Sequence, residues 1–234
     1  MDFSNTRISF NRPVTSYAKV RVLIAALLRN RYAQVNKKRV GKKAYLDIGC
    51  GPNPHERFIN LDYCWHPKID ICWDVTKGIP LGNKAVKGIF SEHCFEHLRF
   101  ESIDFVIREC RRVLEPGGTL RIIVPDGELY LTRYTEITRG RTDLELPYAA
   151  GDRFEEIYSP ILSVNRIFRA HGHLCIYDFD LLRQLLLRNG FVDIRRETFA
   201  SGRDPQLLID SASRAVESLY AEASKPMDGI ALKP

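Results

Sequence analysis

The fold follows from one stretch of the sequence, Tyr45-Leu46-Asp47-Ile48-Gly49-Cys50-Gly51-Pro52. Residues 44–48 form a short apolar segment typical of a buried strand, and the glycines at 49 and 51 let the chain turn sharply after it. In an open α/β sheet, ligands bind outside the carboxyl ends of the strands. We therefore expect an α/β fold with this turn in its binding site.

The sequence on both sides of the turn alternates between strands and helices. Further strands are predicted at 58–61, 69–73, 85–90, 120–124, 192–199 and 215–223. Amphipathic helices are predicted at 102–114 and from Asp178 to about Gly190. Residues 126–176 fit an inserted cap of helix and loop over the substrate. This alternation predicts a doubly wound, mostly parallel sheet.

The charge divides the 234-residue chain into an arm and a body. Residues 1–43 hold 11 Lys and Arg against one acid, so this arm carries +10, whereas the rest of the chain carries −4. Apolar positions at helical spacing predict a helix at 17–33 within the arm. We therefore divide the chain into an N-terminal helical arm (1–43), a main domain (44–225) and a loose tail (226–234).

The role of the arm stays open at this stage. Its helix could pack on the core with its charges in solvent, or it could touch a membrane surface. Nucleic acid is the less favoured partner, because the body is acidic and no RNA-binding module is present. The apolar run at 22–28 is too short to cross a bilayer, and no secretory signal is evident, so we expect a cytoplasmic protein with reduced cysteines.

Polar residues end the first four strands, and their spacing suits an adenosine ligand. The residues concerned are Asp47, Asp62, Asp74 and Ser91. Pro54 stands where a dinucleotide fingerprint needs its third glycine, which disfavours NAD and FAD. S-adenosylmethionine has adenosine without phosphate, and its cationic end, ribose and adenine each favour an acidic or acceptor group.

Five motifs, in this order along the chain, resemble those of class I S-adenosylmethionine-dependent methyltransferases. They lie at 45–52, 61–62, 73–75, 90–93 and 112–118. The chain is particularly similar to a small bacterial, type 11-like branch with the pattern IGCGPNP, SEH-x-x-EH, RVL-x-PGG and HGH-x-x-x-YD. The resemblance spans about residues 44–225 and implies a seven-stranded sheet with a reversed last strand.

The resemblance also assigns cofactor residues. It implies that Asp47, Gly49 and Gly51 hold the methionine end of S-adenosylmethionine, and that Asp62 holds the ribose. Asp74 and Val75 would hold the adenine, and we place Ser91 with this set. Asp62 is only the eleventh residue after Gly51, which leaves room for about one helical turn before the second strand.

The stretch His93-Cys94-Phe95-Glu96-His97 matches H-x-x-E-H, an inverted zinc-protease pattern. Two histidines four residues apart could bind zinc with the glutamate as base. A third ligand has no sequence signature, however, and the methyltransferase pattern already includes this stretch. We therefore expect no metal.

Transfer of a methyl group to a hydroxyl or amine requires removal of a proton, and four residues are candidates for contacting the acceptor or acting as base. They are His93 after the fourth strand, Asp126 after the fifth, and His171 and His173 before the helix at Asp178. We expect a methyltransferase acting on a small molecule or glycan, at a hydroxyl. The alternatives are an RNA or protein methyltransferase that uses the arm, and a non-catalytic S-adenosylmethionine-binding protein.

Overall fold

The computed structural model describes residues 23, 27, 33–152 and 157–229. The helix predicted at 17–33 lies outside the described residues, except for positions 23, 27 and 33. Most of the arm also lies outside them. None of the helices in the described part of the chain has the length and apolar character needed to span a bilayer.

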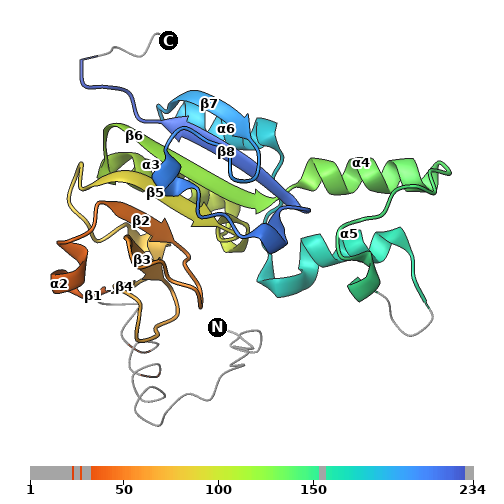
Figure 1. Ribbon diagram of the computed structural model, residues 1–234, viewed down its shortest axis with the longest axis horizontal. Coiled ribbons are helices and arrows are strands. Elements are labelled where there is room, and N and C mark those ends of the chain that lie inside the picture. The colour runs from red at the N-terminus through yellow and green to blue at the C-terminus, as the bar shows by residue number, and fades with distance from the viewer. Residues whose placement is uncertain (1–22, 24–26, 28–32, 153–156, 230–234) are drawn as a thin grey trace.

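One eight-stranded sheet forms the centre of the molecule (Figure 1). Its strands are β1 (Gln34–Val35), β2 (Tyr45–Ile48), β3 (Phe58–Asp62), β4 (Ile71–Cys72), β5 (Val86–Glu92), β6 (Leu114–Pro125), β7 (Val192–Glu197) and β8 (Ser218–Ser224). Their order across the sheet is β1-β4-β3-β2-β5-β6-β8-β7. β2 to β6 run parallel, and β8 is antiparallel to both of its neighbours. The predicted fold class and the reversed last strand are therefore confirmed.

The prediction of seven strands was wrong, because β1 adds an antiparallel edge strand beside β4. Gln34 pairs with Cys72 and Val35 with Ile71, and Asn36 N–H donates to the Asp70 carbonyl at 2.8 Å. A two-residue strand has no alternating pattern that a sequence could reveal. Residues 34–43, counted with the arm in the sequence analysis, thus pack against the sheet.

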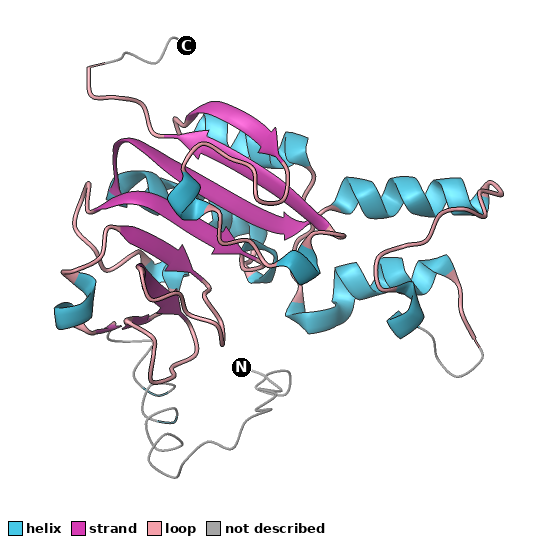
Figure 2. Cartoon of the chain, viewed as in Figure 1, coloured by secondary structure: helices cyan, strands magenta, loops and turns pink. Residues whose placement is uncertain are grey.

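The helices are α2 (Lys37–Val40), α3 (Phe100–Val113), α4 (Gly127–Thr138), α5 (Pro160–Arg169) and α6 (Phe179–Arg188). Figure 2 shows α3 and α6 together on one face of the sheet, and these are the two helices predicted from amphipathic spacing. The buried side of α3 carries Ile103, Val106, Ile107, Cys110 and Val113. The other face is covered by the segment between β7 and β8, where Leu207 packs on Phe58 and Phe90.

The inserted segment forms a projection from the sheet in which α4 and α5 lie side by side (Figure 1). Its root is held by polar contacts: Tyr130 Oη donates to Glu217 Oε2 at 2.9 Å, and Arg166 Nη2 donates to Tyr130 Oη at 2.7 Å. Arg166 also stacks over the ring of Tyr148 at 5.2 Å. These aromatic and basic side chains therefore stabilise the projection itself.

Candidate functional site

A cavity of about 660 Å³ lies at the carboxyl ends of β2, β3 and β5. Its wall includes Gly49, Gly51, Asp62, Asp74, Val75 and His93, six of the residues singled out in the sequence. This volume is in the range of small-molecule sites. A second cavity, of about 730 Å³, lies between α3 and α6 and contains Arg108, Arg112 and Lys225. It is away from the strand ends, so the first cavity is the candidate site.

Gly49 is required by its surroundings. Its φ of +77° is unfavourable for residues with a Cβ, and a Cβ there would lie 2.5 Å from the Cβ and Sγ of Cys94. Gly51 has a φ of +55° and donates its N–H to Asp62 Oδ2 at 2.8 Å. The turn thus brings backbone rather than side chains to the wall of the cavity.

Asp62 ends β3 with its carboxylate on the cavity wall. Oδ2 accepts the Gly51 N–H, and Oδ1 accepts the Cys64 N–H at 2.7 Å. These two bonds fix the orientation of the carboxylate, while each oxygen keeps a second lone pair for a ligand. Burial raises the pKa of Asp62, and the two backbone N–H groups partly offset this. The site therefore holds a fixed acceptor pair at the end of the second parallel strand.

The next strand end provides both a polar and an apolar wall. Asp74 caps the 3₁₀ turn at Val75–Lys77, where its Oδ1 accepts the Thr76 N–H at 3.0 Å. Val75 and Trp73 line the cavity beside it, and Trp73 Nε1 is anchored by donation to the Gly78 carbonyl at 2.8 Å. A flat ring could lie here between apolar side chains with an acceptor at its edge.

Asp47 and Ser91 lie behind the cavity wall. Asp47 is buried, and burial with repulsion from Asp62 and Glu92 raises its pKa to about 8. Ser91 is fully buried and its Oγ donates to the Ile48 carbonyl at 3.0 Å. Ser91 therefore supports the strand that carries the glycine turn, whereas Asp47 places an ionisable group directly below it.

His93 stands on the cavity wall in a strained backbone conformation, with a φ of +48°. Positive φ in a residue with a Cβ is uncommon and is concentrated at functional sites. The ring is held at one nitrogen, since Nε2 lies 2.9 Å from Ser218 Oγ, at hydrogen-bond distance, whereas Nδ1 faces the Glu96 carboxylate at 3.2 Å without a hydrogen bond. The structure thus orients this imidazole beside the glycine turn.

The other three base candidates do not line the cavity. Asp126 caps α4 through the Leu129 N–H and its Oδ2 pairs with Arg196 Nη2 at 2.8 Å, so both oxygens already serve the fold. His171 is exposed with a φ of +58°. His173 is half-buried with Nδ1 2.6 Å from the Ile167 carbonyl, and burial lowers its pKa.

Several wall residues were missed by the sequence reasoning. They are Cys94, His97, Leu98, Arg99, Ser102 and Leu174. Most of them lie between β5 and the first turn of α3, where their proximity to His93 in the chain was a usable signal. Leu174 comes from the segment after α5, and nothing in its sequence context indicated that it approaches the cavity.

Residues 53–122 match a family model described as a methyltransferase domain. The match identifies a methyltransferase domain in this chain. The chain is an enzyme that depends on S-adenosylmethionine. The matched segment carries β3, β4, β5 and most of β6, and the glycine turn after β2 lies just ahead of it. No curated protein sequence matches this methyltransferase.

Solved structures with a similar fold include a SAM-dependent methyltransferase from Archaeoglobus fulgidus, with 18% identity, a TM-score of 0.47, and coverage of 88% of this chain and 94% of that one. A phosphoethanolamine N-methyltransferase 2 from Haemonchus contortus has 13% identity and a TM-score of 0.48. The alignment covers 87% of this chain and 52% of that one, so this methyltransferase spans about half of that chain. An S-adenosylmethionine-dependent methyltransferase from Mesorhizobium loti has 17% identity and a TM-score of 0.45, with 80% and 93% covered.

Proposed function

We propose that this methyltransferase transfers a methyl group to a hydroxyl of a small molecule or saccharide, in the cytoplasm, as a member of the small bacterial branch that its motifs resemble. The observation that carries the proposal is that His93 shares one cavity with the glycine turn and the strand-end carboxylates. An oriented imidazole beside a donor site suits proton removal from a hydroxyl.

The residues present fit the donor. Gly49 and Gly51 present backbone to the cavity, and the fixed acceptor pair of Asp62 suits a ribose diol. Asp74 and Val75 on the cavity wall would hold the adenine. Asp47 below the turn would attract the cationic methionine end once its carboxyl releases the proton, since its pKa is raised to about 8. When bound, S-adenosylmethionine supplies an electrophilic methyl group on its sulfonium.

The acceptor end is formed by His93 and the first turn of α3. Ser218 holds the His93 ring in place through Nε2, so little reorganisation is needed before the imidazole accepts a proton. Arg99 and Ser102 add polar groups to the same wall. These side chains would position the acceptor oxygen and take its proton.

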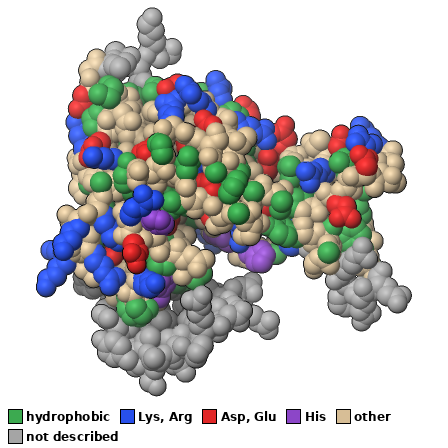
Figure 3. Space-filling view, viewed as in Figure 1, with side chains coloured by type: hydrophobic (Ala, Val, Ile, Leu, Met, Phe, Trp, Pro, Cys, Tyr) green, Lys and Arg blue, Asp and Glu red, His purple; other side chains and the backbone are tan. Residues whose placement is uncertain are grey.

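A compact acceptor is favoured by size and by charge. A cavity of about 660 Å³ that already holds the donor leaves space for a small group. The nucleic-acid alternative rested on the basic arm, but Lys43 Nζ is bound 2.6 Å from Asp70 Oδ2. Figure 3 shows Lys and Arg side chains gathered over α2, at the far edge of the sheet, where Lys37, Lys38 and Arg39 are exposed.

The test is transfer of labelled methyl from S-adenosylmethionine to separate pools of small molecules, glycans, RNA and protein. We expect label in a small-molecule or glycan product that base treatment does not cleave, as an ether resists and an ester does not. Label confined to RNA or protein would contradict the proposed acceptor class, and absence of turnover with intact donor binding would favour the non-catalytic alternative.

A variant pair tests the role of His93. His93→Gln should lower kcat by about 100-fold or more while donor affinity changes little, because the loss falls on proton removal. His55→Gln is the matched control, since His55 is partly buried and lies outside the cavity wall. Equal activity of the two variants would rule out His93 as the base.

A further inference from the structure

Glu96 is a fully buried carboxylate that lacks a donor. It lies in the 3₁₀ turn Phe95–His97, and among the described residues neither of its side-chain oxygens accepts a hydrogen bond. His93 Nδ1 and His97 Nε2 lie 3.2 and 3.8 Å from Oε1, but neither forms a hydrogen bond with it. A buried carboxylate in this state has a large desolvation cost unless a cation offsets it.

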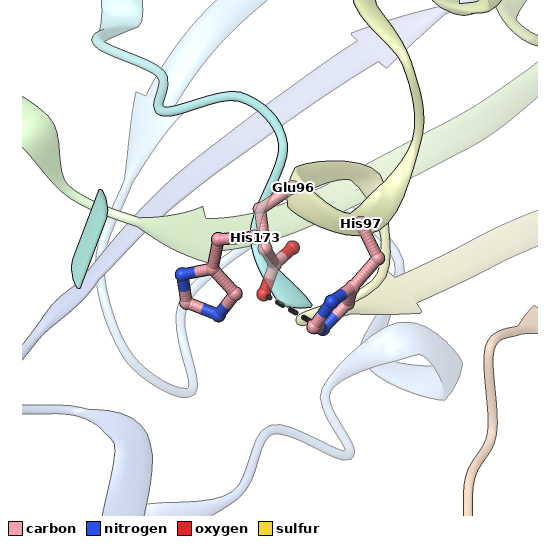
Figure 4. Close-up of side chains that lie close together, drawn as sticks. All are labelled: Glu96, His97 and His173. Atoms are coloured by element: carbon pink, nitrogen blue, oxygen red, sulfur yellow. Dashed lines mark ion pairs between the residues drawn. The ribbon is translucent and has the colours of Figure 1, made fainter. Parts of the chain in front are cut away.

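Backbone contacts bring a distant histidine to this carboxylate. The Glu96 carbonyl accepts the N–H groups of Leu174 and Cys175 at 2.7 and 3.2 Å, which fixes the segment after α5 against the turn. His173 thereby lies beside Glu96 and His97 (Figure 4). One potential ligand atom from each of the three side chains lies within 4.8 Å of the other two.

The tautomer of His173 is set by its own hydrogen bond. Its Nδ1 lies 2.6 Å from the Ile167 carbonyl, and a carbonyl can only accept, so Nδ1 carries the proton. The lone pair is then on Nε2. Metal-binding histidines characteristically donate their other N–H to a carbonyl or carboxylate in this way.

We propose that Glu96, His97 and His173 bind a divalent transition-metal ion. Two imidazoles and one carboxylate with an open position form the ligand set of catalytic zinc sites and of some iron sites. Tetrahedral zinc at about 2.0–2.1 Å places its ligand atoms roughly 3.3 Å apart, which modest side-chain rotations achieve from the observed spacing. The His97 side chain is 37% exposed and lines the donor cavity, so the site adjoins the reacting groups.

The sequence reasoning had excluded a metal because a third ligand was missing from the H-x-x-E-H stretch. That ligand is His173, supplied 76 residues after His97 by the fold. If the proposed function holds, the ion would bind the acceptor hydroxyl and lower its pKa, which is the usual contribution of such a site.

The experiment measures zinc binding to the full-length protein without donor or acceptor, so its outcome does not depend on the proposed function. Protein is stripped with a chelator, and zinc is titrated in competition with a chromophoric indicator. We expect one zinc per chain, and affinity should drop by about 100-fold or more in Glu96→Gln and in His173→Gln. Cobalt should give a visible absorption band in the wild type that both variants lose.

His171→Asn is the matched control. His171 is exposed, its ring lies 5.8 Å from that of His173, and asparagine tolerates its positive φ. This variant should bind zinc within about threefold of the wild type. Thermal unfolding and donor binding of Glu96→Gln serve as the folding check, since that change removes a buried charge and keeps the shape.

Two results would overturn the site. A wild-type protein with no stoichiometric zinc binding would show that Glu96, His97 and His173 do not form a metal site. A folded Glu96→Gln variant with wild-type zinc affinity would place any bound zinc elsewhere, for example at the exposed thiol of Cys64.

Discussion

A Cβ on Gly49 would lie 2.5 Å from both the Cβ and the Sγ of Cys94, a residue of the loop after β5. The glycine turn after β2 and the histidine-containing loop after β5 are therefore packed backbone against side chain. Any change at one of them is transmitted to the other.

The variant Gly49→Ala tests this packing. We expect at least a tenfold loss of donor affinity and about 1–3 kcal/mol of stability, because the new methyl group must displace Cys94 at a positive φ. Gly82→Ala is the control, since a Cβ there meets no atom within 4 Å. Isothermal calorimetry with S-adenosylhomocysteine and thermal unfolding measure both effects. Similar losses in the two variants would contradict the packing argument.

The buried Asp47 predicts a pH effect on stability. Its pKa in the folded state is about 8, above its value of 3.8 in an unfolded chain, because burial and repulsion from Asp62 and Glu92 oppose ionisation. The folded state therefore retains a proton that the unfolded state has lost. This contribution is fully present below about pH 4 and is lost as the pH rises to about 8.

Asp47→Asn should remove this dependence. The stability difference between the variant and the wild type should grow between pH 5 and about 8, by at most about 1.4 kcal/mol per pH unit, and then level off. Chemical denaturation across this range measures it. Parallel curves for the two proteins would show that Asp47 is ionised in the folded state.

Ionisation of Asp47 should affect donor affinity in the opposite direction from stability. A cationic ligand favours ionised Asp47, so donor affinity of the wild type should rise as the pH approaches about 8, with release of a proton on binding. Calorimetry in buffers of different ionisation enthalpy detects that proton. Asp47→Asn should bind the donor more weakly and release no proton from this position.

Asp62 should contribute to donor affinity, and its replacement by Asn should also weaken the glycine turn, because the amide nitrogen cannot accept the Gly51 or Cys64 N–H. Asp62→Asn is expected to weaken donor binding about 10- to 100-fold, because the amide can no longer accept both ribose hydroxyls. Asp204→Asn is the control, since Asp204 also accepts a backbone N–H two residues ahead but lies outside the cavity wall. If Asp62→Asn binds the donor as tightly as this control, the ribose assignment is wrong.

Arg121 forms a buried ion network on the face of the sheet opposite α3 and α6, and we expect this network to contribute more to the free energy of unfolding than an exposed ion pair does. Arg121 is fully buried on β6, and its guanidinium donates to Asp210 at 2.9 and 2.5 Å and to Glu222 at 2.8 Å. Arg121→Met leaves two buried carboxylates unpaired, so we expect a loss of about 3–5 kcal/mol in urea unfolding. Arg141→Met breaks an exposed pair with Asp143 and should cost at most about 1 kcal/mol. Comparable losses would contradict this ranking.

Local patterns carried most of the fold prediction. Short apolar runs that end in acids gave β2, β3 and β5, and the regular spacing of Ile103, Val106 and Ile107 gave α3. Each strand buries a continuous apolar run and α3 buries one apolar face, so the spacing of apolar residues in the sequence predicts both kinds of element. The short link before β3 also came from counting residues between Gly51 and Asp62.

The remaining features depend on contacts between distant segments. β1 exists because two residues pair with β4, and His173 reaches Glu96 through backbone hydrogen bonds across the cap. Asp47 has an acidic side chain typical of a site wall, yet the direction of its strand places it behind the glycine turn. No local pattern records such placements, because they depend on how the elements pack.

The pairing of β1 with β4 also determines where the domain can be cut. A chain beginning at residue 44 would lose both β1 and the ion pair between Lys43 and Asp70, and it would expose the backbone N–H and C=O groups of β4. An open strand edge recruits strands from other molecules. The shortened protein should therefore self-associate as its concentration rises, whereas one beginning at residue 33 should keep β4 covered by β1.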